Sequence, residues 1–81
     1  MKYWLYIVKC SDSSLYTGIS KDVNKRIWQH NNSKVGAKSI KGKRPVILVY
    51  SKKYKSLGDA LRREIEIKSW SRKKKLDLIN I

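Results

Sequence analysis

Several residue types are scarce in this chain of 81 residues, and each scarcity removes a class of site. The single cysteine excludes an internal disulfide and a zinc site built from cysteines. The single histidine excludes a metal site with several histidine ligands. The sequence also contains neither a glycine-rich phosphate loop nor the elbow that presents a nucleophilic serine or cysteine. The chemistry of this protein therefore has to come from other side chains.

Long apolar stretches are also missing, which bears on where the protein resides. No segment approaches the ~20 consecutive apolar residues that cross a bilayer, and Lys9 interrupts the short apolar run near the N-terminus. This run also lacks the small-residue cleavage site of a signal peptide. We therefore expect a cytoplasmic protein with no membrane partner.

Acidic residues are few, whereas basic residues are abundant. The chain has 6 aspartates and glutamates against 20 lysines and arginines, which gives a formal net charge of +14. Repulsion at this charge opposes a compact fold, so a polyanion is the natural partner, and nucleic acid is the first choice. Hydrophobic residues make up 41% of the chain, which is enough for a folded core. The composition predicts a basic globular protein that binds nucleic acid.

Residue patterns divide the chain into six elements of one domain, residues 1–81. Apolar and β-favouring residues predict strands at 4–10, 15–20 and 46–50, of which the first two form a hairpin. Capping residues and apolar spacing predict helices at 22–31, 56–70 and 72–79. Residues 32–44 and 52–55 are polar and basic, and they are predicted to be loops. The order ββαβαα predicts an α+β fold around an antiparallel hairpin.

Glu64 occupies an unusual position on the helix predicted at residues 56–70. Apolar side chains cover one side of this helix over an arc of roughly 160°, and Glu64 lies near the middle of the arc. A carboxylate there loses water at a cost of several kcal/mol unless a cation compensates. The position predicts that Glu64 is either a metal ligand or an ion-pair partner. The apolar residues of the arc are Leu57, Ala60, Leu61, Ile65 and Ile67.

Arg26 and His30 lie four residues apart on the first predicted helix, so their side chains are neighbours. Both are beside Val23 and Ile27, which are on the side predicted to face the core. Two interpretations stay open. His30 is either a hydrogen-bonded core histidine, with Arg26 extending to solvent, or the two residues belong to a site.

Tyr6 and Tyr16 lie on the two strands of the predicted hairpin. An even-length turn would place their side chains on opposite faces of the sheet, and a three-residue turn or a bulge would place them on the same face. Gly18 follows Tyr16 by two residues within the second strand. A glycine inside a strand often marks a bulge or the close approach of a ligand.

Basic residues also cluster in the predicted loops and at the start of the last predicted helix. A cluster of this kind is usually a solvated face, but several clusters in a small chain with few acids favour contacts to a phosphate backbone. No helix carries an obvious set of base-reading side chains, so recognition of backbone shape is expected. The predicted nucleic-acid-binding residues are Lys38, Lys41, Lys43, Arg44, Lys68, Arg72 and Lys73.

Five short motifs in this order and spacing resemble those of the GIY-YIG nuclease superfamily, and within it the small bacterial and archaeal proteins made of this domain alone. The resemblance covers nearly the whole chain. Trp4-Leu5 stands where the first motif has Gly-Ile, and Thr17 stands where the second has Ile. The motifs are Trp4-Leu5-Tyr6; Tyr16-Thr17-Gly18; Arg26 with His30; Gly36-Ala37-Lys38 with Lys43-Arg44-Pro45; and Ala60-Leu61-Arg62-Arg63-Glu64 with Ile67-Lys68.

The resemblance implies a three-stranded antiparallel sheet flanked by three helices and hydrolysis of DNA phosphodiester bonds with one Mg²⁺ or Mn²⁺ ion. It implies that Glu64 holds the metal and that Arg26 binds the scissile phosphate. Tyr16 would orient or deprotonate the attacking water, with support from Tyr6, and His30 would assist proton transfer or positioning.

Three functions follow as hypotheses. The first is a metal-dependent endonuclease that recognises branched or single-stranded DNA by shape, with a possible protein partner that supplies the target. The second is a nucleic-acid-binding module without turnover, acting within a DNA repair or processing complex. The third is a basic structural protein in which Glu64 pairs with Arg26 or Lys68. The oligomeric state is not predicted by the sequence.

Overall fold

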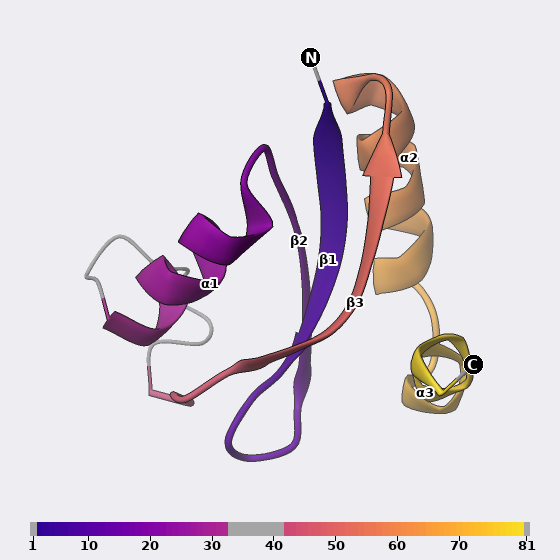
Figure 1. The fold of residues 1–81 in the computed structure, drawn as a ribbon. Coiled ribbons are helices and arrows are strands. Elements are labelled where there is room, and N and C mark those ends of the chain that lie inside the picture. The colour runs from indigo at the N-terminus through magenta and orange to yellow at the C-terminus, as the bar shows by residue number, and fades with distance from the viewer. Residues whose placement is uncertain (1, 33–41, 81) are drawn as a thin grey trace.

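The computed structural model describes residues 2–32 and 42–80. Within these ranges the chain forms three antiparallel strands and three helices in the order ββαβαα, which confirms the predicted α+β fold. Figure 1 shows the arrangement. The elements are β1 (Tyr3–Lys9), β2 (Leu15–Ser20), α1 (Val23–Asn32), β3 (Ile47–Tyr54), α2 (Leu57–Lys68) and α3 (Arg72–Ile79).

The central strand of the sheet is β1, because the strand order is β2-β1-β3. Its middle residues are apolar on both sides, as a strand covered on both faces requires, and Leu5, Tyr6, Ile7 and Val8 are buried. α1 lies on one side of the sheet, and α2 lies on the other (Figure 1). No helix in the described ranges is long and apolar enough to cross a membrane.

Each face of the sheet carries its own core. On the α1 side, Tyr6 and Val8 pack with residues of α1 and of the segment before β3. On the other side, Leu5 and Ile7 pack with Ile67 of α2 and with residues of α3. This division follows from the alternation of side chains along β1. Residues two apart on a strand therefore share a core, which decides which side chains can meet in a site.

The predicted caps start all three helices. Asp22 accepts a hydrogen bond from the backbone N–H of Lys25 (3.0 Å) at the start of α1. Ser56 accepts one from Asp59 N–H (3.2 Å), and Ser71 starts α3 in the same way. A side-chain oxygen at this position satisfies an N–H that has no partner within the helix.

The third strand is longer than predicted. It runs to Tyr54, so the segment 52–55, predicted as a basic loop, is mostly strand. The prediction failed because lysines are rare in buried strands. β3 lies at the edge of the sheet, where exposed lysines are tolerated and also discourage pairing with another chain.

The buried face of α2 also differs from the prediction. Ala60 and Ile67 are buried as expected, but the remaining apolar residues of the predicted arc are at least 40% exposed. The side that packs on the sheet is centred between Ala60 and Ile67, so Glu64 lies at the margin of this side and not at its middle. Its side chain keeps 16% of its accessible surface. The exposed apolar residues are Leu57, Leu61 and Ile65.

Candidate active site

Tyr6 and Tyr16 lie on the same face of the sheet, which is the face covered by α1. Tyr16 is opposite Val8 in the register, and Val8 shares its face with Tyr6. The turn that joins the strands has an odd number of residues, 10–14, and Ser13 adopts a positive φ of 70° there. The tyrosine ring centroids are 6.4 Å apart, a normal distance for packed aromatic rings.

Gly18 is the register partner of Tyr6, and it makes room for the Tyr6 ring. A Cβ atom at this position would lie 2.5 Å from the Tyr6 hydroxyl oxygen and 2.7 Å from its Cζ. The glycine therefore accommodates the close approach of the Tyr6 side chain, where the sequence predicted a bulge or a ligand. The ring crosses β2 toward α1 because nothing projects from Gly18 to stop it.

His30 is fully buried at the far end of the Tyr6 ring. Its Nε2 is 2.8 Å from the Tyr6 hydroxyl oxygen, and its ring centroid is 5.5 Å from that of Tyr16. Burial lowers the pKa of His30, and the charges of Arg26 and Arg44 lower it further. His30 is thus the hydrogen-bonded core histidine that one of the two interpretations described, and it contacts both tyrosines.

Arg26 lies beside this cluster. Its guanidinium donates a hydrogen bond to Tyr6, which lowers the pKa of the phenol, but the larger effect of burial raises that pKa to about 12. Arg26 Nη1 also donates to Gln29 Oε1 (3.2 Å), which fixes the direction of the guanidinium. Gln29 was not predicted from the sequence, although its position three residues after Arg26 on a helix could have indicated this hydrogen bond.

Glu64 is on α2, which packs on the face of the sheet opposite to α1 (Figure 1). Burial is the main cause of the raised pKa of Tyr6, and the charge of Glu64 is the smallest of the named contributions to it. The carboxylate itself is 3.4 Å from Lys68 Nζ, which realises the ion pair predicted with Lys68. In the described ranges no group of three His, Cys, Asp or Glu side chains converges as a metal cage would require.

The other predicted nucleic-acid-binding residues are dispersed. Lys43 is tied to the hairpin turn, since its Nζ is 3.6 Å from Asp12 Oδ2. Arg44 is close enough to lower the pKa of His30. Arg72 and Lys73 are exposed at the start of α3, and Arg72 follows Lys68 of α2 by four residues in the sequence. Lys38 and Lys41 lie outside the described residues.

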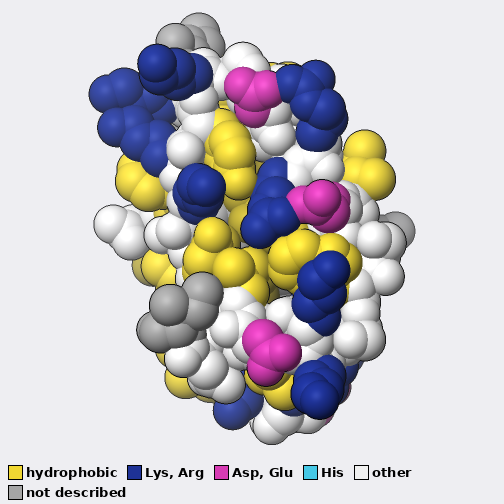
Figure 2. All heavy atoms as spheres, turned by 90° about the vertical axis from the view of Figure 1, so that its right-hand side faces the viewer, with side chains coloured by type: hydrophobic (Ala, Val, Ile, Leu, Met, Phe, Trp, Pro, Cys, Tyr) yellow, Lys and Arg dark blue, Asp and Glu magenta, His cyan; other side chains and the backbone are white. Residues whose placement is uncertain are grey.

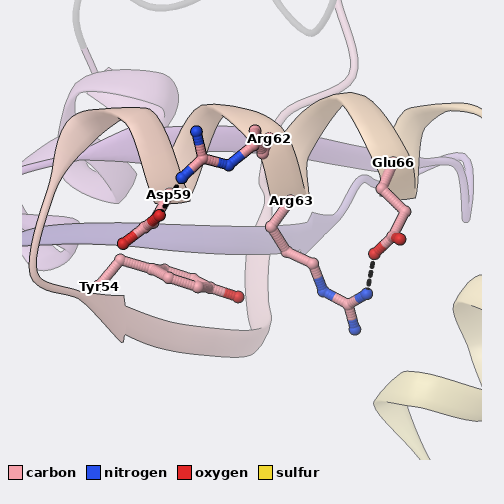
Figure 3. Close-up of a pocket in the computed structure, with 5 residues that line it drawn as sticks. All are labelled: Tyr54, Asp59, Arg62, Arg63 and Glu66. Atoms are coloured by element: carbon pink, nitrogen blue, oxygen red, sulfur yellow. Dashed lines mark hydrogen bonds and ion pairs between the residues drawn. The ribbon is translucent and has the colours of Figure 1, made fainter.

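A cavity of about 370 Å³ lies elsewhere, where α2 passes the end of β3. Figure 3 shows its lining, and both of its arginines are engaged by acids. Arg62 is paired with Asp59, and Arg63 is paired with Glu66. Two cations neutralised by two anions offer little attraction to a phosphate. This cavity is therefore a weaker candidate than the cluster around Tyr6. Tyr54 completes its lining.

Comparisons with known proteins bear on this cluster. The sequence profile of the GIY-YIG catalytic domain matches residues 2–77. A UPF0213 protein of Staphylococcus saprophyticus is 56% identical over 79 residues, which cover 98% of this chain and 95% of that protein. One from Staphylococcus epidermidis is 55% identical over 78 residues, with 96% and 94% covered.

Solved structures agree with the sequence comparisons. The solution structure of a UPF0213 protein of Bacillus halodurans superposes with a TM-score of 0.65 at 41% identity, covering 99% of this chain and 84% of that one. The solution structure of a protein from E. faecalis gives a TM-score of 0.68 at 28% identity with the same coverage. The chain therefore belongs to the GIY-YIG nuclease superfamily, among its small members.

Proposed function

We propose that this protein is a divalent-metal-dependent endonuclease that hydrolyses DNA phosphodiester bonds and recognises backbone shape or branching more than sequence. One observation carries the proposal: both motif tyrosines and His30 are in mutual contact, and Arg26 and, more weakly, Glu64 influence the pKa of the Tyr6 phenol. These residues come from β1, β2, α1 and α2, so the fold brings together side chains that the sequence separates.

The residues around Glu64 fit a hard cation. A lone carboxylate with a partly exposed side chain suits Mg²⁺ or Mn²⁺, which bind through one or two carboxylates and retain several waters. The ammonium of Lys68 at 3.4 Å shows that this carboxylate already attracts a cation. When bound, the metal would act as a Lewis acid at the phosphate and stabilise the leaving oxygen.

Arg26 is the residue that would bind the scissile phosphate. A guanidinium presents donors in a planar fork that matches two phosphate oxygens, and it stays charged at every relevant pH. Its contact with Gln29 restricts its rotation before substrate arrives. Charge that develops on the phosphate in the transition state would meet a donor that is already oriented.

The two tyrosines have different parts in this proposal. Tyr6 is 1% exposed and its pKa is raised to about 12, so it keeps its proton and does not serve as the base. It positions His30 and Arg26 instead. Tyr16 is partly exposed at the rim of the same cluster, where it can orient the attacking water. His30 is buried, and it acts through the tyrosines rather than on the substrate.

The proposal is tested with a panel of labelled duplex, flap, fork, junction and single-stranded DNA in Mg²⁺ or Mn²⁺. The expected result is metal-dependent nicking that is strongest on branched substrates and absent with Glu64→Ala, while DNA binding persists. Nicking that persists in Glu64→Ala would mean a contaminating nuclease or a different site. Protein that binds the panel and never cuts would instead establish a nucleic-acid-binding module without turnover.

A further inference from the structure

β1 begins and β3 ends at the same end of the sheet (Figure 1). Aromatic rings and lysines lie together at this end. Three of the rings at this end each carry a lysine ammonium over one face, at 5.6–5.8 Å from the ring centroid. None of these residues belongs to the cluster around Tyr6. The pairs are Tyr3 with Lys21, Trp4 with Lys53, and Tyr54 with Lys52.

Lysines also crowd together at this end. Lys2 lies close enough to Lys53 to lower the pKa of the Lys53 ammonium. A pocket of about 360 Å³ is lined by these two lysines with Tyr54 and Lys55, and no acidic side chain lines it. Basic side chains also gather at the upper end of the view in Figure 2. An anion between such cations would relieve their repulsion.

Trp4 also forms part of a second hollow, on the α1 side of the sheet. This groove of about 330 Å³ lies between the start of α1 and β3, where apolar Val23 and Leu48 line it. Its other lining residues are polar or charged: Lys21, Asp22, Asn24 and Ser51. Its volume is at the lower end of the range for small-molecule sites, which suits one planar ring. A flat aromatic side chain flanked by polar groups is the lining that a nucleobase requires.

The groove borders the core around Tyr6, because Val23 of α1 lines the groove and also packs against that core. Asn24 lines the groove, and Arg26, two positions further on, is about 160° away around the helix. Asn31, on the same flank as Asn24, is hydrogen-bonded to both backbone groups of Val46 just before β3. The groove and the cluster around Tyr6 are therefore neighbours on the α1 side of the sheet, with Val23 between them.

We propose that this end of the sheet binds an unpaired DNA strand, with a base against Trp4 and a phosphate between Lys2 and Lys53. Base stacking on an aromatic ring contributes about 1–3 kcal/mol, whereas an exposed cation–π contact contributes about 0.5–1 kcal/mol. A base therefore displaces the lysine from the ring, and the released ammonium is free to bind the phosphate. A duplex cannot do this, because its base faces are already stacked.

This inference rests on the proposed function in taking DNA as the partner, and it adds a strand-holding surface beside the cleavage site. Its test needs no cleavage. Binding of a fluorescent oligothymidine is measured by anisotropy in EDTA over a range of salt concentrations. The variants are Lys53→Ala and Trp4→Leu, and the matched control is Lys9→Ala, which removes one exposed lysine at the opposite end of β1.

Lys53→Ala should weaken binding several-fold and reduce the salt dependence by about 0.7 in the slope of log K against log salt, as one lost phosphate contact requires. Trp4→Leu should weaken binding about 5- to 100-fold and remove most of the tryptophan quenching that DNA causes. Lys9→Ala should change little. Equal losses of affinity in Lys9→Ala and Lys53→Ala would overturn the proposal. Duplex DNA, polyglutamate or anionic vesicles that bind as tightly as the oligothymidine would also overturn it. Because Glu64→Ala should bind normally in this assay, loss of cleavage and loss of strand binding are distinguished.

Discussion

Replacing Gly18 with alanine is the change that the structure predicts most sharply. The new Cβ would lie 2.5 Å from the Tyr6 hydroxyl oxygen, 2.7 Å from Cζ and 3.0 Å from Cε2. The ring cannot move aside easily, because Tyr6 is buried and its hydroxyl is bonded to His30 at 2.8 Å. Either the two strands separate or Tyr6 leaves His30.

Both responses lower the free energy of unfolding. Overpacking of a buried site costs about 1–3 kcal/mol, and loss of the hydrogen bond between Tyr6 and His30 adds ~1 kcal/mol. A chain of this length has a total stability of roughly 4–12 kcal/mol, so a loss of about 2–4 kcal/mol is a large part of it. Urea unfolding followed by circular dichroism measures the difference directly.

Gly58→Ala is the matched control for this prediction. A Cβ there would approach nothing closer than 3.8 Å, the distance to Arg62 Nη1, and the position is in the first turn of α2. Alanine favours a helix over glycine by up to about 1 kcal/mol, so this variant should be as stable as the parent or more so. If Gly18→Ala unfolded within about 0.5 kcal/mol of the parent, the packing described for Tyr6 would be wrong.

The remaining predictions concern the charged groups of the site. The pKa of His30 is lowered in the folded protein, so on acidification the unfolded chain binds a proton before the folded protein does. The free energy of unfolding should therefore fall as the pH drops below about 6.5. His30→Gln should reduce this dependence on pH, which urea unfolding at several pH values measures. Arg26→Ala should slow DNA cleavage by roughly two to three orders of magnitude, whereas the exposed neighbour Lys25→Ala should leave the single-turnover rate nearly unchanged. Lys68→Ala should raise the affinity for Mn²⁺ by no more than about fivefold in calorimetry, because the Lys68 side chain is 53% exposed and water screens its charge. Weaker Mn²⁺ binding would place the metal elsewhere.

Much of the fold could be predicted because local signals agree with it. Asp22, Ser56 and Ser71 are caps whose chemistry is local, and all three start helices at the expected places. A glycine is unusual within a strand, and at Gly18 the reason is that the Tyr6 ring occupies the place of a side chain. The end of β3 was not predictable from composition, because tolerance of Lys52 and Lys53 depends on the strand being at an edge.

The site was only partly predictable. Spacing on α1 paired Arg26 with His30, but burial of His30 depends on the Tyr6 ring reaching it from another element. The face of α2 was predicted with an error, since the exposed Leu57 and Ile65 were counted with the core. A helix with apolar residues on more than one side does not reveal from its sequence which side meets the sheet.

Glu64 is the residue proposed to hold the metal ion for DNA cleavage. The most direct test compares Glu64→Gln with Glu66→Gln in single-turnover cleavage of one labelled DNA substrate with Mn²⁺. Both changes remove one negative charge from α2, but Glu66 is exposed and paired with Arg63, away from the tyrosines. We expect the Glu66→Gln variant to cut at nearly the parental rate and the Glu64→Gln variant not to cut. Both variants should still bind DNA. Equal cleavage by the two variants would contradict this role of Glu64.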